Sequence, residues 1–130
     1  MKRGIFFVLL FVPVLDAYAI KPFHTDGCSR FPDGTRKEPK LWLNCCVEHD
    51  KDYWVGGSRK ERLISDRALR LCVKNAGKSF ISKLMYLGVR FGGTPYLPTK
   101  FRWGYGWSYP RGYKIISPEE LILIADVMEK

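Results

Sequence analysis

The sequence predicts a small, mostly α-helical domain tied together by disulfides. Apolar residues recur at helical spacing along two neighbouring segments, residues 59–75 and 78–91. Ser58 and Ser117 each precede a glutamate by three residues, which is the pattern of a capping box that begins a helix. The four cysteines are an even number in a small chain that begins with an export signal, so two disulfides are expected. Together these observations favour the all-α class.

The amino-terminal residues have the pattern of a secretory signal peptide. Lys2 and Arg3 precede an apolar run from Ile5 to Leu15, and Ala17-Tyr18-Ala19 is a small-x-small cleavage signature. The run is shorter than the ~20 residues that a membrane-spanning helix needs, so a permanent anchor is less favoured. We expect residues 1–19 to be a signal peptide that is cut after Ala19, which makes the protein secreted or periplasmic.

Residues 20–130 are long enough for one domain with one modest core. The chain has a formal net charge of +9, and 15% of its residues are aromatic. A basic surface favours anionic partners. Trp and Tyr prefer the membrane–water interface, so an exported chain of this composition fits a phospholipid membrane surface better than nucleic acid. We therefore expect a phospholipid partner and no nucleic acid.

The first half of the domain reads as a loop followed by two helices. Turn-forming residues predict a loop over Lys21 to Lys40. A central helix should begin near Pro39 and end before Gly56-Gly57. A second helix should run from Arg59 to Asn75 and end at Gly77. The short glycine connection makes the two helices antiparallel neighbours.

The second half reads as a third helix, an aromatic segment and a terminal helix. In the third helix, Lys78 to Phe91, core packing is favoured over membrane binding for an apolar stripe: Phe80, Leu84, Leu87 and Phe91. Alternating aromatic residues from Phe101 to Tyr109 suggest a short strand or hairpin within a surface and lid region, residues 92–113. Proline at the first helical position predicts a docking helix from Pro118 through Val127.

The central helix concentrates the residues that can do chemistry. At helical spacing one face carries two cysteines, an imidazole, a carboxylate and a phenol: Cys45, Cys46, His49, Asp50 and Tyr53. On the second helix Asp66 interrupts an apolar stripe, and a buried lone carboxylate costs several kcal/mol unless it is paired. Antiparallel packing makes His49 its candidate partner. A histidine–carboxylate pair beside a metal-binding acid is the hypothesis that follows.

Several alternatives remain open from the residues alone. A zinc site built from Cys45, Cys46 and His49, with His24 as a further candidate ligand, is one alternative, although adjacent cysteines fit zinc spacing poorly. His49 could instead complete a purely structural hydrogen-bond network. The segment Thr25 to Thr35 could supply oxygens to calcium or could form an ordinary Asp-Gly turn. Adjacent cysteines are unlikely to bond each other, which leaves two arrangements that tie the central helix to Cys28 and Cys72.

Three motifs between Thr25 and Cys72 resemble the secreted phospholipase A2 family. Cys45-Cys46-x-x-His49-Asp50-x-x-Tyr53 resembles the family's active-site helix, and Asp66-Arg67-Ala68-x-x-x-Cys72 resembles its second long helix. Asp26-Gly27-Cys28-Ser29, followed by Pro32-Asp33, is similar to the metal loop of the small bacterial and fungal members. Where the animal enzymes have Gly-x-Gly-Gly, this chain has Ser29-Arg30-Phe31-Pro32. The aromatic segment has no assignable counterpart.

The resemblance implies a phospholipase A2-like fold and calcium-dependent hydrolysis of the central (sn-2) acyl ester of glycerophospholipids. It implies catalytic roles for His49, as general base, and Asp66, which orients the imidazole. It implies calcium (Ca2+) ligands on Asp50, Asp26 and Gly27, the last through its carbonyl. It further implies that Tyr53 braces Asp66, and that the disulfides are Cys28–Cys46 and Cys45–Cys72. The alternative is a non-catalytic protein of this fold that binds membranes or an anionic partner through its basic aromatic C-terminal region.

Overall fold

The computed structural model describes residues 19–130, and the described part of the chain is all-helical, with four helices and no strand. They are α1 (Leu43–Val55), α2 (Arg59–Asn75), α3 (Ser79–Gly92) and α4 (Pro118–Met128). The predicted signal peptide lies outside the described residues, apart from Ala19. None of the described helices is both long and apolar enough to cross a membrane.

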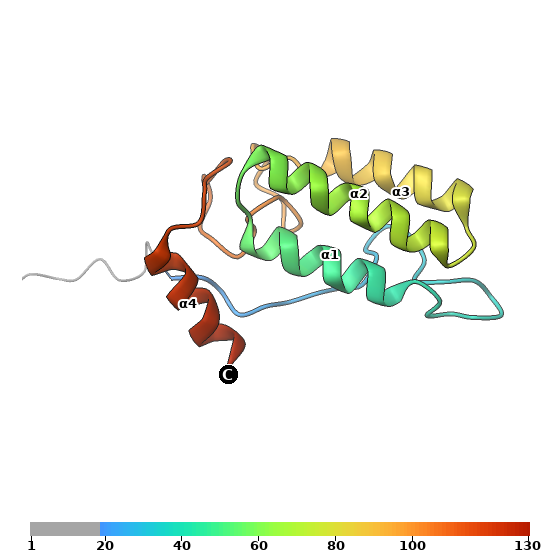
Figure 1. Ribbon diagram of the computed structural model, residues 1–130, viewed down its shortest axis with the longest axis horizontal. Coiled ribbons are helices and arrows are strands. Elements are labelled where there is room, and N and C mark those ends of the chain that lie inside the picture. The colour runs from blue at the N-terminus through green and yellow to red at the C-terminus, as the bar shows by residue number, and fades with distance from the viewer. Residues whose placement is uncertain (1–18) are drawn as a thin grey trace, which may run out of the picture.

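The first three helices form one layered unit. α1 and α2 run antiparallel, and α2 lies between α1 and α3 (Figure 1). α4 lies outside this unit, at one end of the molecule (Figure 1). Two disulfides join this unit: Cys28–Cys46 ties the loop before α1 to that helix, and Cys45–Cys72 ties α1 to α2. Both pairs are those that the resemblance implied, and all four cysteines are used.

The helix boundaries match the sequence predictions to within one residue except at the start of α1. In α2 the predicted capping box is present, with both reciprocal hydrogen bonds between Ser58 and Glu61. α1 begins at Leu43 rather than near Pro39. The backbone N–H of Trp42 donates to Asp33 O at 3.0 Å, and its indole N–H donates to Pro32 O at 2.7 Å. These contacts hold the preceding residues in turns, so Pro39 stays outside the helix.

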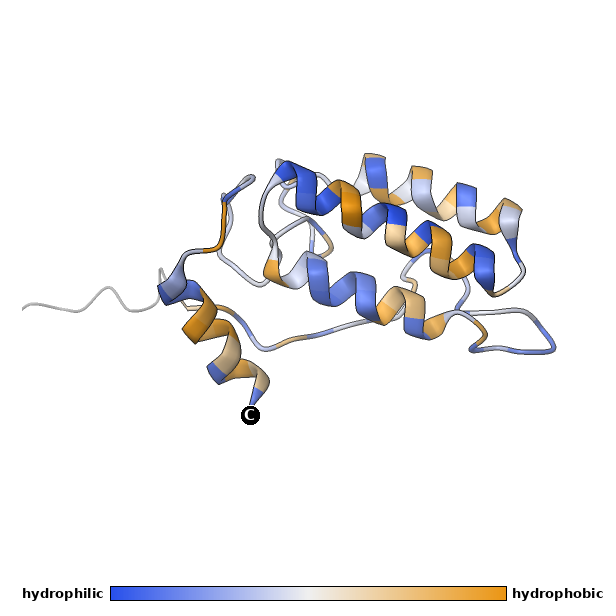
Figure 2. Ribbon diagram, viewed as in Figure 1, coloured by the Kyte–Doolittle hydropathy of each residue, from blue (hydrophilic) through white to orange (hydrophobic). Residues whose placement is uncertain are grey.

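The prediction that the apolar stripe of α3 packs on the core is wrong. Phe80 is 72% exposed and Phe91 is 82% exposed, whereas the buried residues of this helix are Ser82 and Met85. Figure 2 shows apolar residues recurring along α3 and covering much of α4. The face of α3 that meets α2 carries small or flexible side chains, and the larger apolar residues are left on the surface.

The predicted strand or hairpin over Phe101 to Tyr109 is also wrong, because this segment forms successive turns. Its backbone donors bond to the end of α1 rather than to a partner strand. Gly104 N–H donates to Tyr53 O at 2.6 Å, and Gly106 N–H donates to Trp54 O at 3.1 Å. The last turn of a helix leaves carbonyl groups without intrahelical donors. The aromatic segment therefore caps the carboxyl end of α1.

The tryptophans of the aromatic segment are core residues rather than surface residues. Trp103 and Trp107 are each 2% exposed, and their indole N–H groups donate to Gly57 O and Val55 O at 2.9 and 2.7 Å. A core cluster forms around Trp107 with Ile20 and Trp54, and α4 docks on it through Ile124, Val127 and neighbouring apolar residues. The interpretation of residues 92–113 as a surface lid thus holds only for part of the segment.

An extended segment, residues 20–25, is called the strap here; it runs along α1 and leads into the loop before that helix (Figure 1). Lys21 N–H donates to Gly106 O at 2.8 Å, and the indole of Trp54 donates to Lys21 O at 2.8 Å. Ile20 is buried at the start of the strap. These contacts anchor the strap a few residues before Thr25, where the site begins.

Candidate active site

The structure brings together the predicted histidine and carboxylate. Nε2 of His49 on α1 lies 2.7 Å from Oδ1 of Asp66 on α2, and both residues are buried, with Asp66 fully inaccessible. A carboxylate accepts hydrogen bonds only, so Nε2 carries the proton and Nδ1 keeps a free lone pair. The pair can therefore offer a proton acceptor at Nδ1.

Asp66 is held by a wider set of donors than the sequence indicated. The hydroxyl of Tyr53 donates to Oδ1 at 2.7 Å, and Arg90 Nη1 on α3 donates to Oδ2 at 2.6 Å. Burial by itself would raise the pKa of Asp66, but the hydrogen bonds from His49, Tyr53 and Arg90 outweigh it and lower that pKa. Asp66 therefore stays ionised inside the protein.

Two arginines in this network were not predicted. Arg62 Nε lies 3.8 Å from Asp66 Oδ2 and donates to the hydroxyl of Tyr53 at 3.0 Å. Its spacing of four residues before Asp66 on the same helix is a signal that could have identified it. Arg90 carries no such signal, because it reaches Asp66 from another helix.

Tyr53 is locked in place by its surroundings. Burial, followed by the charge of Asp66, raises the pKa of this phenol, so it remains a neutral donor. Gly93 lies directly against its ring: a Cβ atom at this position would be 2.5 Å from Tyr53 Cε1 and 2.7 Å from its hydroxyl. The close approach requires glycine.

Asp50 follows His49 on α1 and meets the end of the strap. Thr25 Oγ1 donates to Asp50 Oδ2 at 2.6 Å, and Tyr105 donates to the carbonyls of His24 and Asp50 at 2.6 and 3.3 Å. Burial raises the pKa of Asp50 to about 6, opposed by the Thr25 hydrogen bond and the charge of His49. Neither Thr25 nor Tyr105 was predicted as a site residue.

Asp26 and Gly27 lie in the loop that faces Asp50. The negative charge of Asp26 is close enough to contribute to the raised pKa of Asp50, and Asp26 Oδ1 accepts from Ser29 Oγ at 2.7 Å. Gly27 has a positive φ of 72°, and a Cβ there would lie 2.7 Å from Asp33 Oδ1. The loop therefore brings the carboxylate of Asp26 and the backbone of Gly27, which carries no side chain, towards Asp50.

The donor set fits a hard cation that takes oxygen from both side chains and backbone. The negative charge of Asp26 helps to raise the pKa of Asp50, and a divalent cation between the two carboxylates would relieve this repulsion. Among the described residues there is no group of three or more acidic, histidine or cysteine side chains placed to hold a metal. Calcium accepts six to eight oxygens that include carbonyls and water, so a full side-chain cluster is not required.

The zinc alternative is wrong. Cys45 and Cys46 are each bonded to another cysteine in a disulfide, and zinc requires thiolates. His24 is exposed on the strap and has no cysteine ligand to join.

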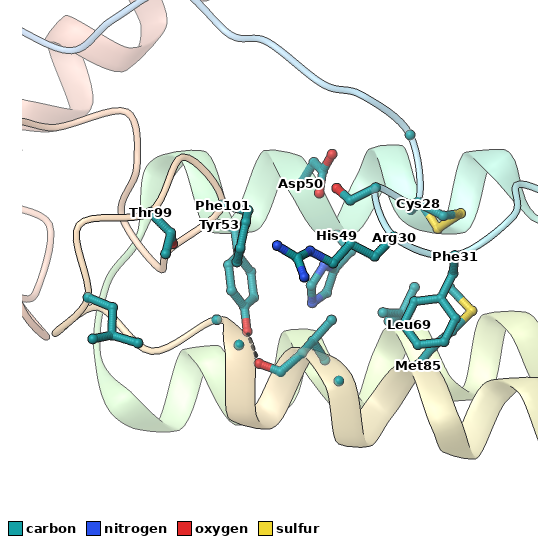
Figure 3. A pocket seen from close by; sticks show the side chains of 18 residues that line it. Cys28, Arg30, Phe31, His49, Asp50, Tyr53, Leu69, Met85, Thr99 and Phe101 are labelled. Atoms are coloured by element: carbon teal, nitrogen blue, oxygen red, sulfur yellow. Dashed lines mark hydrogen bonds between the residues drawn. A yellow bond between two sulfur atoms is a disulfide. The ribbon is translucent and has the colours of Figure 1, made fainter.

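The histidine–carboxylate pair opens onto a cavity of about 410 Å³. His49, Asp50 and Tyr53 line one wall, and Figure 3 shows them between the loop before α1 and the segment that follows α3. Most of the remaining lining is apolar and includes Phe31, Leu69, Met85, Val89, Leu97 and Phe101. Pockets of this size and character bind small or chain-like organic molecules.

The arrangement has the parts of a water-activating site: an oriented imidazole, an oxygen-rich loop for a cation, and an apolar cavity beside them.

Comparison with known proteins finds no family model, no curated protein and no solved structure that matches this chain.

Proposed function

We propose that this chain is a calcium-dependent phospholipase A2-like hydrolase that cleaves the sn-2 acyl ester of glycerophospholipids. The observation that carries the proposal is the 2.7 Å contact between His49 Nε2 and Asp66 Oδ1 at the wall of an apolar cavity. The motif order in the sequence, the two disulfides and the antiparallel pairing of α1 with α2 support a phospholipase A2-like fold.

In the proposed reaction His49 is the general base. Nδ1 accepts a proton from a water molecule whose oxygen attacks the ester carbonyl carbon. The protonated imidazole then returns this proton to the leaving glyceryl oxygen, so that a free fatty acid and a lysophospholipid are formed. Asp66 stabilises the imidazolium and fixes its tautomer, while Tyr53 and Arg90 hold the Asp66 carboxylate.

Asp50, Asp26 and the carbonyl of Gly27 are the groups that would hold the calcium ion. When bound, calcium supplies positive charge against the substrate phosphate and the developing oxyanion. Thr25 keeps the Asp50 carboxylate in place by donating to it. The strap and the Cys28–Cys46 disulfide hold the loop against α1.

The apolar surface of the protein suits contact with a phospholipid membrane. Phe80, Leu87 and Phe91 are exposed along α3, the helix that also contributes Met85 and Val89 to the cavity. Exposed apolar patches of this kind are typical of membrane or ligand contact. Leu97 and Phe101, which line the cavity, are also exposed, at 51% and 40%, so an acyl chain can enter the cavity past apolar side chains.

The test is fatty-acid release from phospholipid mixed micelles, measured with calcium and with excess chelator. We expect turnover only with calcium, and loss of turnover in His49→Gln and Asp50→Asn. Glu48→Gln is the matched control, because it removes one negative charge from an exposed position on the same helix. Calcium-independent turnover that survives in Asp50→Asn would reject the assigned mechanism.

The non-catalytic alternative makes a different prediction. Liposome binding without calcium, and with no lysolipid formed, would favour a binding protein of this fold. Burial of Trp103 and Trp107 removes the largest side chains of the aromatic segment from such a surface. Substitution of Phe91, rather than of these tryptophans, is then the change that should weaken binding.

A further inference from the structure

One wall of the cavity carries a positive charge that the proposed mechanism does not use. Arg30 lines the cavity together with His49 and Asp50, and Figure 3 shows its side chain extending from the loop across the opening. The rest of the lining outside the catalytic wall is mainly apolar. Arg30 is exposed at this opening, so its guanidinium, which has five donors and no acceptor, is accessible to an anionic ligand.

The backbone is shaped to aim Arg30 at the cavity. Phe31 N–H donates to Cys28 O at 3.2 Å, which closes a tight turn with Ser29 and Arg30 at its centre. Ser29 has a φ of 58°, a left-handed conformation that a non-glycine residue adopts rarely. The hydrogen bond from Ser29 Oγ to Asp26 and the Cys28–Cys46 disulfide hold this turn. Strained backbone conformations of this kind are concentrated at functional sites, which suggests that the direction given to the Arg30 side chain serves a function.

Arg30 has no acidic partner among the described residues. None of the ion pairs in residues 19–130 includes it. Its guanidinium lies over the Phe101 ring, whose centroid is 5.9 Å from Cζ of Arg30. Phe101 belongs to the loop on the other side of the cavity, so the guanidinium spans the opening. Its charge is left for a ligand that enters there.

We propose that Arg30 binds the phosphate group of a phosphate ester whose hydrocarbon chain occupies the apolar part of the cavity. The planar guanidinium can donate two parallel hydrogen bonds to phosphate oxygens, which a lysine cannot do. In the proposed reaction this ester is the phospholipid substrate, so the identity of the natural ligand rests on the proposed function. The binding itself does not.

The test is calorimetric titration of the protein, in excess chelator, with three ligands kept below their aggregation concentrations. Monododecyl phosphate carries both groups, dodecyl maltoside carries the chain without charge, and inorganic phosphate carries the charge without the chain. We expect monododecyl phosphate to bind more tightly than either of the others. Arg30→Gln should weaken its binding about tenfold, the size expected for loss of a hydrogen bond to a charged group.

Matched variants separate recognition from structural damage. Arg30→Lys keeps the charge and should weaken monododecyl phosphate binding less than Arg30→Gln does. Arg36→Gln removes an exposed arginine from the same loop, outside the cavity lining, and should change nothing. Binding of dodecyl maltoside should be the same in all variants.

Two outcomes would overturn the proposal. The first is that Arg30→Gln leaves monododecyl phosphate binding unchanged, or weakens it no more than it weakens dodecyl maltoside binding. Inorganic phosphate that binds as tightly as monododecyl phosphate would show that the site takes free phosphate instead of a lipid. Failure of the wild-type protein to hydrolyse any phospholipid would count against the proposed function alone, since these titrations require no turnover.

Discussion

The helical unit α1–α3 and the C-terminal region, residues 93–130, are built on different principles. At the centre of the helical unit lies a charged network in which Asp66, fully buried, bonds to His49 and Arg90. Both disulfides belong to this unit or to the loop before it. The C-terminal region has no disulfide, and it attaches through buried tryptophans whose indole groups bond to backbone carbonyls near the end of α1.

The difference separates chemistry from support. A buried ion network is poor at adding stability, because desolvation offsets most of its Coulomb energy. Buried aromatic side chains contribute strongly through the area they remove from water. Substitutions in the charged network should cost activity, with some loss of stability where they leave a buried charge unpaired, whereas substitutions of the tryptophans should cost stability alone. The following predictions test this division, from the largest effect to the smallest.

Asp66→Asn should reduce turnover by about three to four orders of magnitude, the loss seen when the orienting acid of a catalytic histidine is made neutral. The amide cannot fix the imidazole tautomer, and it leaves Arg90 without its carboxylate. Initial rates of fatty-acid release measure the effect. Asp52→Asn is the control, since Asp52 is an exposed acid of α1 that accepts only from Ser65. A rate for Asp66→Asn within tenfold of wild type would contradict the proposed role.

Trp107→Ala should lower the free energy of unfolding by about 4 kcal/mol, the usual cost of removing a large buried aromatic side chain. Trp107→Phe should cost about 1–2 kcal/mol, because it keeps most of the packing but leaves Val55 O without its donor. Urea unfolding measures both. The folded fraction of each variant should retain its turnover. A loss of turnover without a loss of stability would mean that the two regions are not separable in this way.

Removal of the Cys45–Cys72 disulfide by paired serine substitutions should cost about 3 kcal/mol in stability, because the bond closes a long loop. Removal of Cys28–Cys46 should cost a similar amount and should also weaken calcium binding, because that bond holds the loop of Asp26. Thermal unfolding and calcium titration distinguish the two effects. Equal calcium affinities in both variants would show that the strap alone positions the loop.

Calcium affinity should fall about tenfold for each pH unit below 6, because the Asp50 carboxyl has a pKa of about 6 when folded without metal.

The same raised pKa of Asp50 means that the metal-free folded state binds the proton more tightly than the unfolded state does. The stabilisation that the protonated Asp50 carboxyl gives to the folded state is therefore lost as pH rises from 3.8 towards 6. Asp50→Asn should accordingly be more stable than the metal-free wild type at pH 7. Calcium affinity that is constant from pH 8 to pH 5 would contradict the predicted pH dependence of calcium binding.

Ser117→Ala should cost about 1 kcal/mol by removing the cap of α4. Ser58→Ala removes the matching cap of α2 and should cost a similar amount. Hydrogen exchange locates the loss: in α4 for the first variant and in the helical unit for the second. Turnover should be unchanged by Ser117→Ala. Faster exchange at α1 in that variant would show that α4 supports the site.

The parts predicted well from the sequence are those specified by local signals. The start of α2 and the start of α4 follow from capping boxes at Ser58 and Ser117, which act within one helical turn. The contact between His49 and Asp66 followed from helical spacing and a short connection. In each case the residues that decide the structure lie close together in the chain or on neighbouring helices.

The errors arose where distant residues decide the structure. Alternation from Phe101 to Tyr109 is typical of a strand, but its backbone donors are taken by α1 carbonyls that lie about fifty residues earlier. The stripe on α3 has the pattern of a buried face, yet Phe80 and Phe91 are exposed because α2 packs on the opposite side. Arg90 is indistinguishable from a surface arginine in sequence, since its partner is on another helix.

The close approach of Gly93 to the ring of Tyr53 has a consequence for how the protein tolerates variation. Even the single methyl group of alanine would displace the tyrosine, and the displacement would pass through its hydroxyl to the carboxylate that it holds. A position without any functional group should thus rank among the least replaceable in a saturation screen for enzymatic competence. Chemical inertness at a residue is no guide to its freedom to mutate.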